Sequence, residues 1–103
     1  MNKQPHDLLD ETIHQRTRLA MMATLAGVES LDFNDLKAQL GLTDGNLSTH
    51  ASALERAGFV KIAKTFEDKK PRTAISMTAK GRAALEKYIN LLQGILGRAK
   101  ENP

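Results

Sequence analysis

The sequence predicts a mainly helical α+β fold, with elements in the order helix, short strand, helix, helix, strand, strand, helix. Three observations support this fold class. Apolar residues recur at spacings of three and four in four segments, which is the period of an amphipathic helix. Glycines directly follow the first three of these segments, where they can end a helix. Between the third and fourth segments, residues 59–66 alternate in character, which is typical of a strand.

The first helix is expected at residues 10–26. Asp10 can cap its start, and Gly27 follows its end. Residues 1–7 are polar and contain Pro5, and residues 1–9 are expected to form a flexible arm. A chain of 103 residues has the size of one domain, and we expect that domain to span residues 10–97.

Two short helices joined by a tight turn come next. Residues 29–33 can contribute a few residues of strand. The second helix is then expected to begin at a cap formed by Asp32 or Asn34 and to end at Gly41. The turn GLT leads into the third helix, whose cap is predicted to be Thr43.

A hairpin and a long helix complete the predicted fold. Residues 59–66 and 73–77 are predicted as two strands, joined by a polar turn that contains Pro71. The last helix is expected at residues 78–97, and residues 98–103 are expected to be a frayed tail.

Composition excludes several classes of function. There is no cysteine and the three histidines are scattered, so we expect no metal site and no cofactor. The chain also lacks a glycine-rich phosphate loop and a His–carboxylate motif, so we do not expect an enzyme. No apolar run approaches the ~18–20 residues that cross a bilayer, and no signal peptide is recognisable. We therefore expect a cytoplasmic protein.

The net charge of +3 is unevenly distributed. Residues 1–58 carry five Lys/Arg against eight Asp/Glu, whereas residues 59–103 carry ten against four. This asymmetry suggests a polyanionic partner for one part of the chain. The modest total argues against a non-specific architectural DNA binder, because such proteins depend on many more phosphate contacts.

The third helix has an unusual outer face. At about 100° per residue, Leu47, Ala51 and Leu54 share its inner side. The residues that point away are small and polar, with one long side chain near the far end: Gly45, Ser48, Thr49, Ser52 and Arg56. Such residues lower helix propensity, but they let the helix approach another surface closely. The major groove of DNA, about 12 Å wide, admits a helix of this kind.

Two short helices joined by a glycine turn, the second with this face, describe a helix-turn-helix. The hairpin adds a second basic contact, with Lys64 on its first strand and Lys69, Lys70 and Arg72 around its tip. These cations can lie along phosphates or place an arginine in the minor groove. The alternative is an ordinary solvated hairpin tip, since acidic residues dilute its charge.

The segment "LDFNDLKAQLGLTDGNLSTHASALERAGFVKI", followed by "KKPRTAISMTAKGRAAL", resembles the winged helix-turn-helix domain of small bacterial transcriptional regulators of the MarR and ArsR types. The resemblance covers about residues 15–90. It implies a DNA-binding regulator, usually a homodimer, with a recognition helix at 44–57 and a wing at 67–72. The absence of cysteine does not fit metal sensing of the ArsR kind, and a small-molecule effector is left open.

The candidate DNA-binding residues follow from the helix face, the hairpin and this resemblance. On the recognition helix they are Thr43, Asp44, Gly45, Asn46, Ser48, Thr49 and Ser52. On the wing and its flank they are Lys64, Lys69, Lys70 and Arg72.

The last helix predicts a homodimer. Its apolar stripe covers nearly half of the circumference, whereas packing on one core needs about 100°. The predicted interface combines this helix with one side of the first: Leu9, Ile13, Ala20, Leu85, Tyr88, Ile89, Leu92, Ile95 and Leu96. A two-fold dimer would set two recognition helices roughly 34–36 Å apart on an inverted repeat of double-stranded DNA. The alternative is a helix accommodated within a monomer.

The function predicted from these features is a sequence-specific, double-stranded DNA-binding transcriptional regulator, expected to be a repressor. The alternative is a winged-helix protein-interaction module that does not bind DNA. Salt dependence separates the two, because phosphate contacts make DNA affinity fall steeply with salt.

Overall fold

A computed structural model of the chain describes residues 3–101. Its elements follow the order η1 (a 3-10 helix, Pro5–Leu8), α1 (Arg16–Ala26), β1 (Leu31–Asp32), α2 (Phe33–Leu40), α3 (Asp44–Arg56), β2 (Val60–Glu67), β3 (Lys70–Met77) and α4 (Ala79–Glu101). The three strands form one antiparallel sheet in the order β1-β3-β2. The predicted fold class and order of elements are confirmed, with η1 as an addition.

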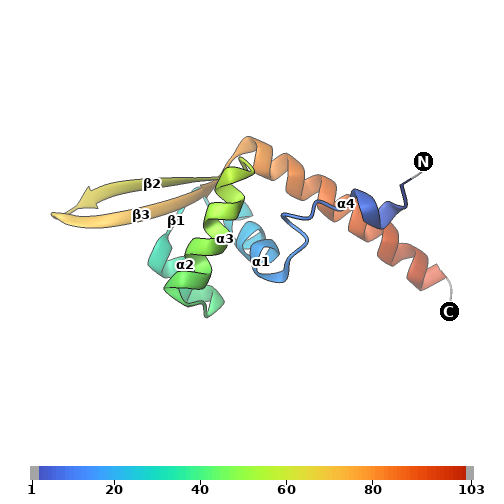
Figure 1. Cartoon of the computed structure of the whole chain (residues 1–103), viewed down its shortest axis with the longest axis horizontal. Helices are drawn as coiled ribbons and strands as arrows, with labels where there is room; N and C mark the ends of the chain where they lie inside the picture. Colours follow the sequence, from blue (N-terminus) through green and yellow to red (C-terminus); the bar gives the residue numbers. More distant parts are fainter. Residues whose placement is uncertain (1–2, 102–103) are drawn as a thin grey trace.

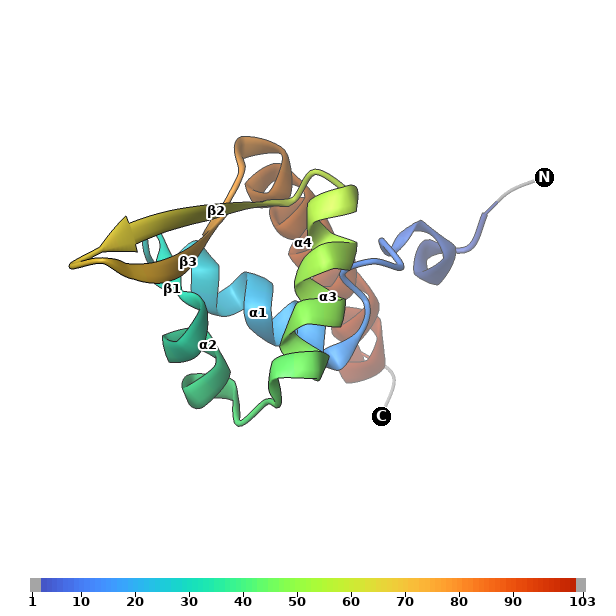
Figure 2. The same ribbon diagram turned by 60° about the vertical axis from the view of Figure 1, so that its left-hand side comes forward.

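The molecule is elongated, with extents of 58 × 27 × 23 Å. The β2–β3 hairpin projects from one end, and α4 extends to the other end, where η1 lies against it (Figure 1). Helix α1 lies in the middle, between α2 and α3 (Figure 2). This layout separates two surfaces, one formed by α2, α3 and the hairpin, the other by η1 and α4. In the part of the chain that the structure describes, no helix is both long and apolar enough to cross a membrane.

Helix α1 forms the centre of the core. Met21, Met22 and Leu25 are completely buried, because the surrounding helices and the sheet pack around this helix. The other large side chains that are completely buried come from the neighbouring segments: Ile13, Leu36, Leu47, Leu54 and Ile75. The apolar stripes predicted for the second and third helices therefore meet in one core.

The predicted caps of α2 and α3 are present, as are the glycines predicted to follow α1 and α2. Asp32 accepts the N–H of Asn34 at 2.8 Å at the start of α2, and Gly41 ends that helix in the left-handed conformation (φ 63°). Thr43 accepts the N–H of Asn46 at 3.1 Å at the start of α3. Each side chain satisfies a backbone donor that the first turn of a helix leaves free.

The start of α1 differs from the prediction. The carboxylate of Asp10 accepts the N–H groups of Thr12 (2.8 Å) and Ile13 (3.2 Å), which makes a turn and not a helix. The helix begins at Arg16, after Gln15, whose side chain accepts the N–H of Arg18 at 2.8 Å. An aspartate can satisfy either a turn or a helix start, and here the turn lets Ile13 enter the core.

The hairpin is longer and tighter than predicted. Its strands run to Glu67 and Lys70, which are paired, so the turn consists of Asp68 and Lys69 alone. Both turn residues have positive φ, 52° and 64°, as a two-residue hairpin turn requires. Pro71 therefore lies within β3 and not in the turn.

Both terminal segments contain helical structure within the described residues. Of the predicted flexible arm 1–9, η1 contacts α4. Of the predicted frayed tail 98–103, residues 98–101 continue α4, so the helix passes through Gly94 and Gly97. Residues 1–2 and 102–103 lie outside the described residues.

Candidate nucleic-acid interface

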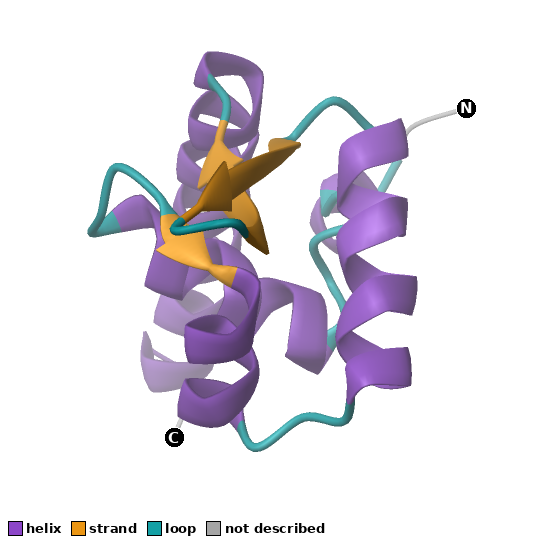
Figure 3. Ribbon diagram, turned by 90° about the vertical axis from the view of Figure 1, so that its left-hand side faces the viewer, coloured by secondary structure: helices purple, strands orange, loops and turns teal. Residues whose placement is uncertain are grey.

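The outer face of α3 is open to solvent. All seven residues predicted for this face and for the helix start are exposed: Thr43, Asp44, Gly45, Asn46, Ser48, Thr49 and Ser52. Figure 3 looks at the molecule along the hairpin, and α2, α3 and the hairpin lie together in front with α4 behind them. Helix α3 and the basic hairpin therefore belong to the same end of the molecule.

A groove of about 420 Å³ runs between α3 and the hairpin. It brings together Ser48 and Ser52 of α3 and Lys64 of β2, which were predicted separately. The other residues that line it are Phe33, Ala51, Glu55, Ile62 and Thr73. Thr73 was missed, although strand alternation could have found it: it pairs with Lys64 across the hairpin and shares its face. The groove offers three hydroxyls, one ammonium and the carboxylate of Glu55 to a ligand.

The start of α3 carries an ion pair that the sequence analysis missed. The Nζ of Lys37, on α2, lies 2.7 Å from a carboxylate oxygen of Asp44. Lys37 precedes the Gly41 turn, and the turn folds it back onto the beginning of α3. The negative charge of Asp44 is thus accompanied by a cation at the place where the helix dipole is positive.

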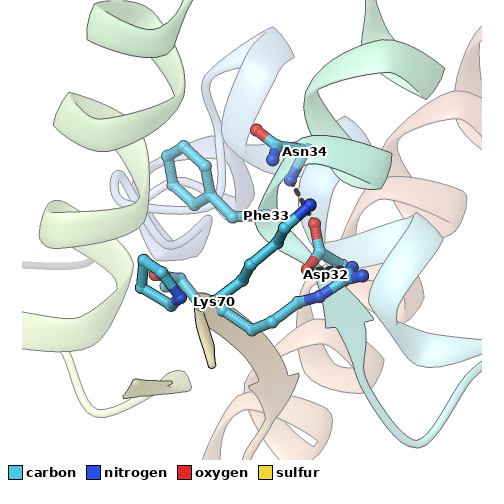
Figure 4. Close-up of a pocket in the computed structure, with 7 residues that line it drawn as sticks. Asp32, Phe33, Asn34 and Lys70 are labelled. Atoms are coloured by element: carbon cyan, nitrogen blue, oxygen red, sulfur yellow. Dashed lines mark hydrogen bonds and ion pairs between the residues drawn. The ribbon is translucent and has the colours of Figure 1, made fainter. Parts of the chain in front are cut away.

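The wing cations differ in their surroundings. Lys69 and Lys70 are exposed at the tip. Arg72, by contrast, lies 3.4 Å from the carboxylate of Asp32 and 3.6 Å from that of Glu67. Figure 4 shows the pocket around this site, with Lys70 extending towards the start of α2, where Asp32 lies. Arg72 is therefore partly neutralised within the protomer, which the sequence analysis did not anticipate.

His50 lies at the inner edge of α3. Its Nδ1 is 3.2 Å from Nη1 of Arg18, and the Nε of Arg18 donates to the carbonyl of Thr12 at 2.5 Å. Burial, and then the charge of Arg18, lower the pKa of His50 below its ordinary value of 6.5. This cluster joins α3 to the segment before α1, so His50 has a structural place behind the exposed face.

The residues predicted for a dimer interface divide into two groups. Ile13, Leu85 and Tyr88 are buried in the protomer core, so they have no surface to offer a partner, which corrects that part of the prediction. Ile89 and Leu96 are exposed by 40% and 53%. The remaining residues are partly buried: Leu9, Ala20, Leu92 and Ile95.

A hydrogen bond accounts for the buried position of Tyr88, and a groove adds Leu8 to the exposed apolar residues. The hydroxyl of Tyr88 is hydrogen-bonded to Nδ1 of His14 at 2.7 Å, which fixes one edge of α4 on the segment before α1. Leu8 of η1, which the sequence analysis did not select, is 49% exposed. It lines a groove with Leu91 and Ile95 of α4. An apolar surface therefore remains on η1 and α4, away from the α3 end.

Comparison with known proteins gives consistent results. The family profile described as "winged helix DNA-binding domain" matches residues 17–96. An uncharacterized protein of Methanocaldococcus jannaschii is 44% identical over 72 residues, which are 70% of this chain and 78% of the relative.

Solved structures show the same fold. A transcriptional regulator homologue from Pyrococcus horikoshii OT3 is 29% identical with a TM-score of 0.83, covering 87% of this chain and 89% of the other. A protein from Enterococcus faecalis V583, assigned to the MarR family of transcriptional regulators, is 23% identical with a TM-score of 0.77, covering 98% and 92%.

Proposed function

The chain belongs to the family of winged helix DNA-binding domains, which is not a family of enzymes, and on that premise we propose that it is a sequence-specific transcriptional regulator. In this proposal the chain binds double-stranded DNA as a homodimer, with α3 in the major groove and the hairpin over the adjacent minor groove. Repression is the expected outcome, because a protein that occupies an operator excludes other proteins from it.

The groove between α3 and the hairpin is the observation that carries the proposal. In a duplex, one sugar–phosphate strand separates each major groove from the next minor groove. If α3 enters the first and the hairpin the second, that strand must pass between them, where Lys64 and the hydroxyls of Ser48, Ser52 and Thr73 line the groove. These groups suit a phosphate, because hydroxyl and ammonium groups are among the donors that contact the DNA backbone. The proposal requires the carboxylate of Glu55, which lines the same groove, to turn away from that phosphate.

Sequence reading is assigned to the exposed polar side chains of the first turns of α3. Asn46, Ser48, Thr49 and Ser52 carry the donors and acceptors that can meet base edges. Gly45 keeps the approach to the helix start unobstructed, and even an added Cβ atom at this position would meet no protein atom within 4 Å.

The wing supplies phosphate contacts that do not depend on sequence. Lys69 and Lys70 are exposed for this role. Arg72 contributes by exchanging its carboxylate partners, Asp32 and Glu67, for a phosphate.

The homodimer in this proposal forms through the apolar surface of η1 and α4. Leu8, Ile89 and Leu96 are the large exposed apolar residues of these two elements. Helix η1 and the C-terminal part of α4 lie at the opposite end of the molecule from the hairpin (Figure 1), so two copies joined there leave both α3 faces free. Two-fold symmetry then presents the α3 helices to an inverted repeat, roughly 34–36 Å apart.

Selection of bound DNA from a random pool tests the proposal directly. We expect one inverted repeat to be enriched, and Ser48→Ala or Asn46→Ala to relax base choice at particular positions. Enrichment of a single half-site would contradict the homodimer, and enrichment of no sequence would contradict sequence-specific binding.

Salt dependence tests the groove and the wing. Lys64→Ala should reduce the slope of log affinity against log salt by about 0.9, the value for one phosphate contact. Arg72→Ala should weaken binding to all sequences. Lys87→Ala is the matched control, because it removes the same charge from an exposed position on α4. Equal effects of Lys64→Ala and Lys87→Ala would reject the groove as the backbone site. A wild-type protein without salt-dependent DNA binding would favour the protein-interaction module.

A further inference from the structure

The hairpin carries an aromatic side chain that the fold does not use. Phe66 of β2 is 78% exposed, more than any other large apolar residue in the described part of the chain. It contributes nothing to the hydrophobic core. An isolated exposed apolar residue needs no explanation, but Phe66 lies on the wing, close to the groove proposed for the DNA backbone.

Strand alternation places Phe66 on a defined face of the hairpin. Residues two apart on a strand share a face, so Phe66 lies on the same face as Lys64 and Ile62. Across the hairpin it pairs with Pro71, and Lys64 pairs with Thr73. Ile62, Lys64 and Thr73 line the groove that faces α3. Phe66 and Pro71 therefore extend one wall of this groove out to the tip.

The hairpin holds this apolar pair in a fixed place. The turn beyond it has only two residues, and the strands pair without interruption from Val60 with Met77 to Glu67 with Lys70. Pro71 has a restricted φ and no N–H to donate. It is tolerated in the middle strand β3 because β1 pairs only with Ala74 and Ile75 and does not reach it, and its ring lies across from Phe66. Phe66 and Pro71 therefore lie near the tip of a hairpin whose two strands are paired throughout.

Cations surround this apolar pair. Lys64 precedes it on the same face, Lys69 and Lys70 follow at the tip, and the carboxylate of Glu67 is paired with Arg72. Asp68 in the turn adds a second carboxylate, so the four cations and two carboxylates of residues 64–72 leave a net charge of +2. An apolar tip with a cationic rim matches the minor groove of DNA, where phosphates border the opening and sugars and base edges form the interior. It matches a second copy of this chain poorly, because two such rims would repel each other.

We propose that Phe66, supported by Pro71, acts as an apolar wedge that enters the minor groove, partly unstacks one base step and kinks the duplex. This inference rests on the proposed DNA-binding function and adds a specificity determinant to it. Proteins that bend DNA insert side chains such as Phe and Pro between base steps in this way. The wing would then favour flexible pyrimidine–purine steps beneath its tip, without any hydrogen bond to a base.

The experiment uses the full chain and an operator obtained by selection. DNA bending is measured by energy transfer between dyes at the two duplex ends, and unstacking by 2-aminopurine fluorescence at the step beneath the wing. Phe66→Ala should bind about tenfold more weakly, with a reduced bend and little fluorescence increase, because stacking contacts of aromatic residues are worth a factor of this order. Phe66→Leu should retain part of the bend, since leucine can also act as a wedge.

Two controls separate this effect from charge and from folding. Thr65→Ala changes the exposed neighbour on the opposite face of β2 and should leave affinity and bend unchanged. The salt slope of Phe66→Ala should equal that of the wild type, because no charge is removed. Thermal unfolding of Phe66→Ala should also match the wild type, since the side chain is outside the core.

The outcomes distinguish this inference from the proposed function. If the wild type selects no DNA, the proposed function fails, and the wedge fails with it. If the wild type binds its operator but Phe66→Ala has the same affinity and bend, the wedge alone is overturned. Weaker binding with an unchanged bend also overturns it, because Phe66 would then contact the groove without opening a base step. A change of oligomeric state in Phe66→Ala would assign the residue to a protein contact instead.

Discussion

Replacing Gly81 with alanine tests how closely α4 packs against the start of the hairpin. Gly81 is buried in the first turn of α4. A Cβ atom at this position would lie 2.1 Å from the carbonyl oxygen of Phe59, and 2.8 and 2.9 Å from its carbonyl carbon and Cα. Ordinary Cβ contacts do not fall below 3.0 Å, so the two backbones would have to separate by about 1 Å.

The backbone around this contact has little freedom to move. Thr78 donates its N–H to the carbonyl of Phe59 at 3.0 Å and its hydroxyl to that of Gly58 at 2.6 Å. The same hydroxyl accepts the N–H of Gly81 at 2.9 Å, as the cap of α4. Separating α4 from Phe59 would therefore strain the two hydrogen bonds that hold Thr78 on Gly58 and Phe59, or the cap bond of Gly81 if Thr78 stays in place, as well as the packing.

The expected loss of stability follows from two opposing terms. Overpacking costs typically 1–3 kcal/mol, and we take about 3 kcal/mol because the obstructing atoms are backbone. The gain from replacing a helical glycine with alanine offsets about 1 kcal/mol of this. A net loss of about 2 kcal/mol corresponds to a fall in Tm of roughly 8–16 °C for a domain of this size.

Gly94→Ala is the matched control for Gly81→Ala. It makes the same change in the same helix, at a position where the added Cβ meets nothing within 4 Å. Its stability should rise by up to about 1 kcal/mol. Both variants are melted by circular dichroism at one protein concentration, because association makes Tm depend on concentration. If Gly81→Ala melts at or above the wild-type temperature, the described packing of α4 on Phe59 is wrong.

Two further substitutions examine α3. Gly45→Ala should keep or slightly raise thermal stability, since the new methyl group meets no protein atom within 4 Å. It should weaken operator binding about tenfold, because the methyl group would obstruct the approach of the duplex. Unchanged affinity would mean that the start of α3 stays clear of DNA. The pKa of His50 is lowered below 6.5 in the folded protein, so between pH 6.5 and this lowered pKa the imidazole is protonated more in the unfolded chain than in the folded one. The free energy of unfolding of the wild type should therefore fall as the pH falls through this window. His50→Gln should reduce this slope in pH-dependent thermal unfolding, and an equal slope would assign the dependence to other groups.

Local signals in the sequence predicted α2 and α3 well. Asp32, Gly41 and Thr43 each act on backbone groups within three or four residues, so a cap or a stop can be recognised without knowing the rest of the fold. The exposed face of α3 followed from the helical period for the same reason. The start of α1 was mispredicted because Asp10 satisfies a turn as well as it would a helix, and the burial of Ile13 favours the turn.

The sequence by itself determined the helix periods, the caps of α2 and α3, the basic character of the wing and the small polar face of α3, because each depends on neighbours along the chain. Only the tertiary structure decided which residues meet across long separations. It paired Arg72 with Asp32, placed Lys64 and Ser48 along the same groove, and buried Leu85 while leaving Leu96 exposed. An apolar stripe or a cation is visible in the sequence. Whether the protomer uses it or leaves it for a partner depends on packing between distant segments.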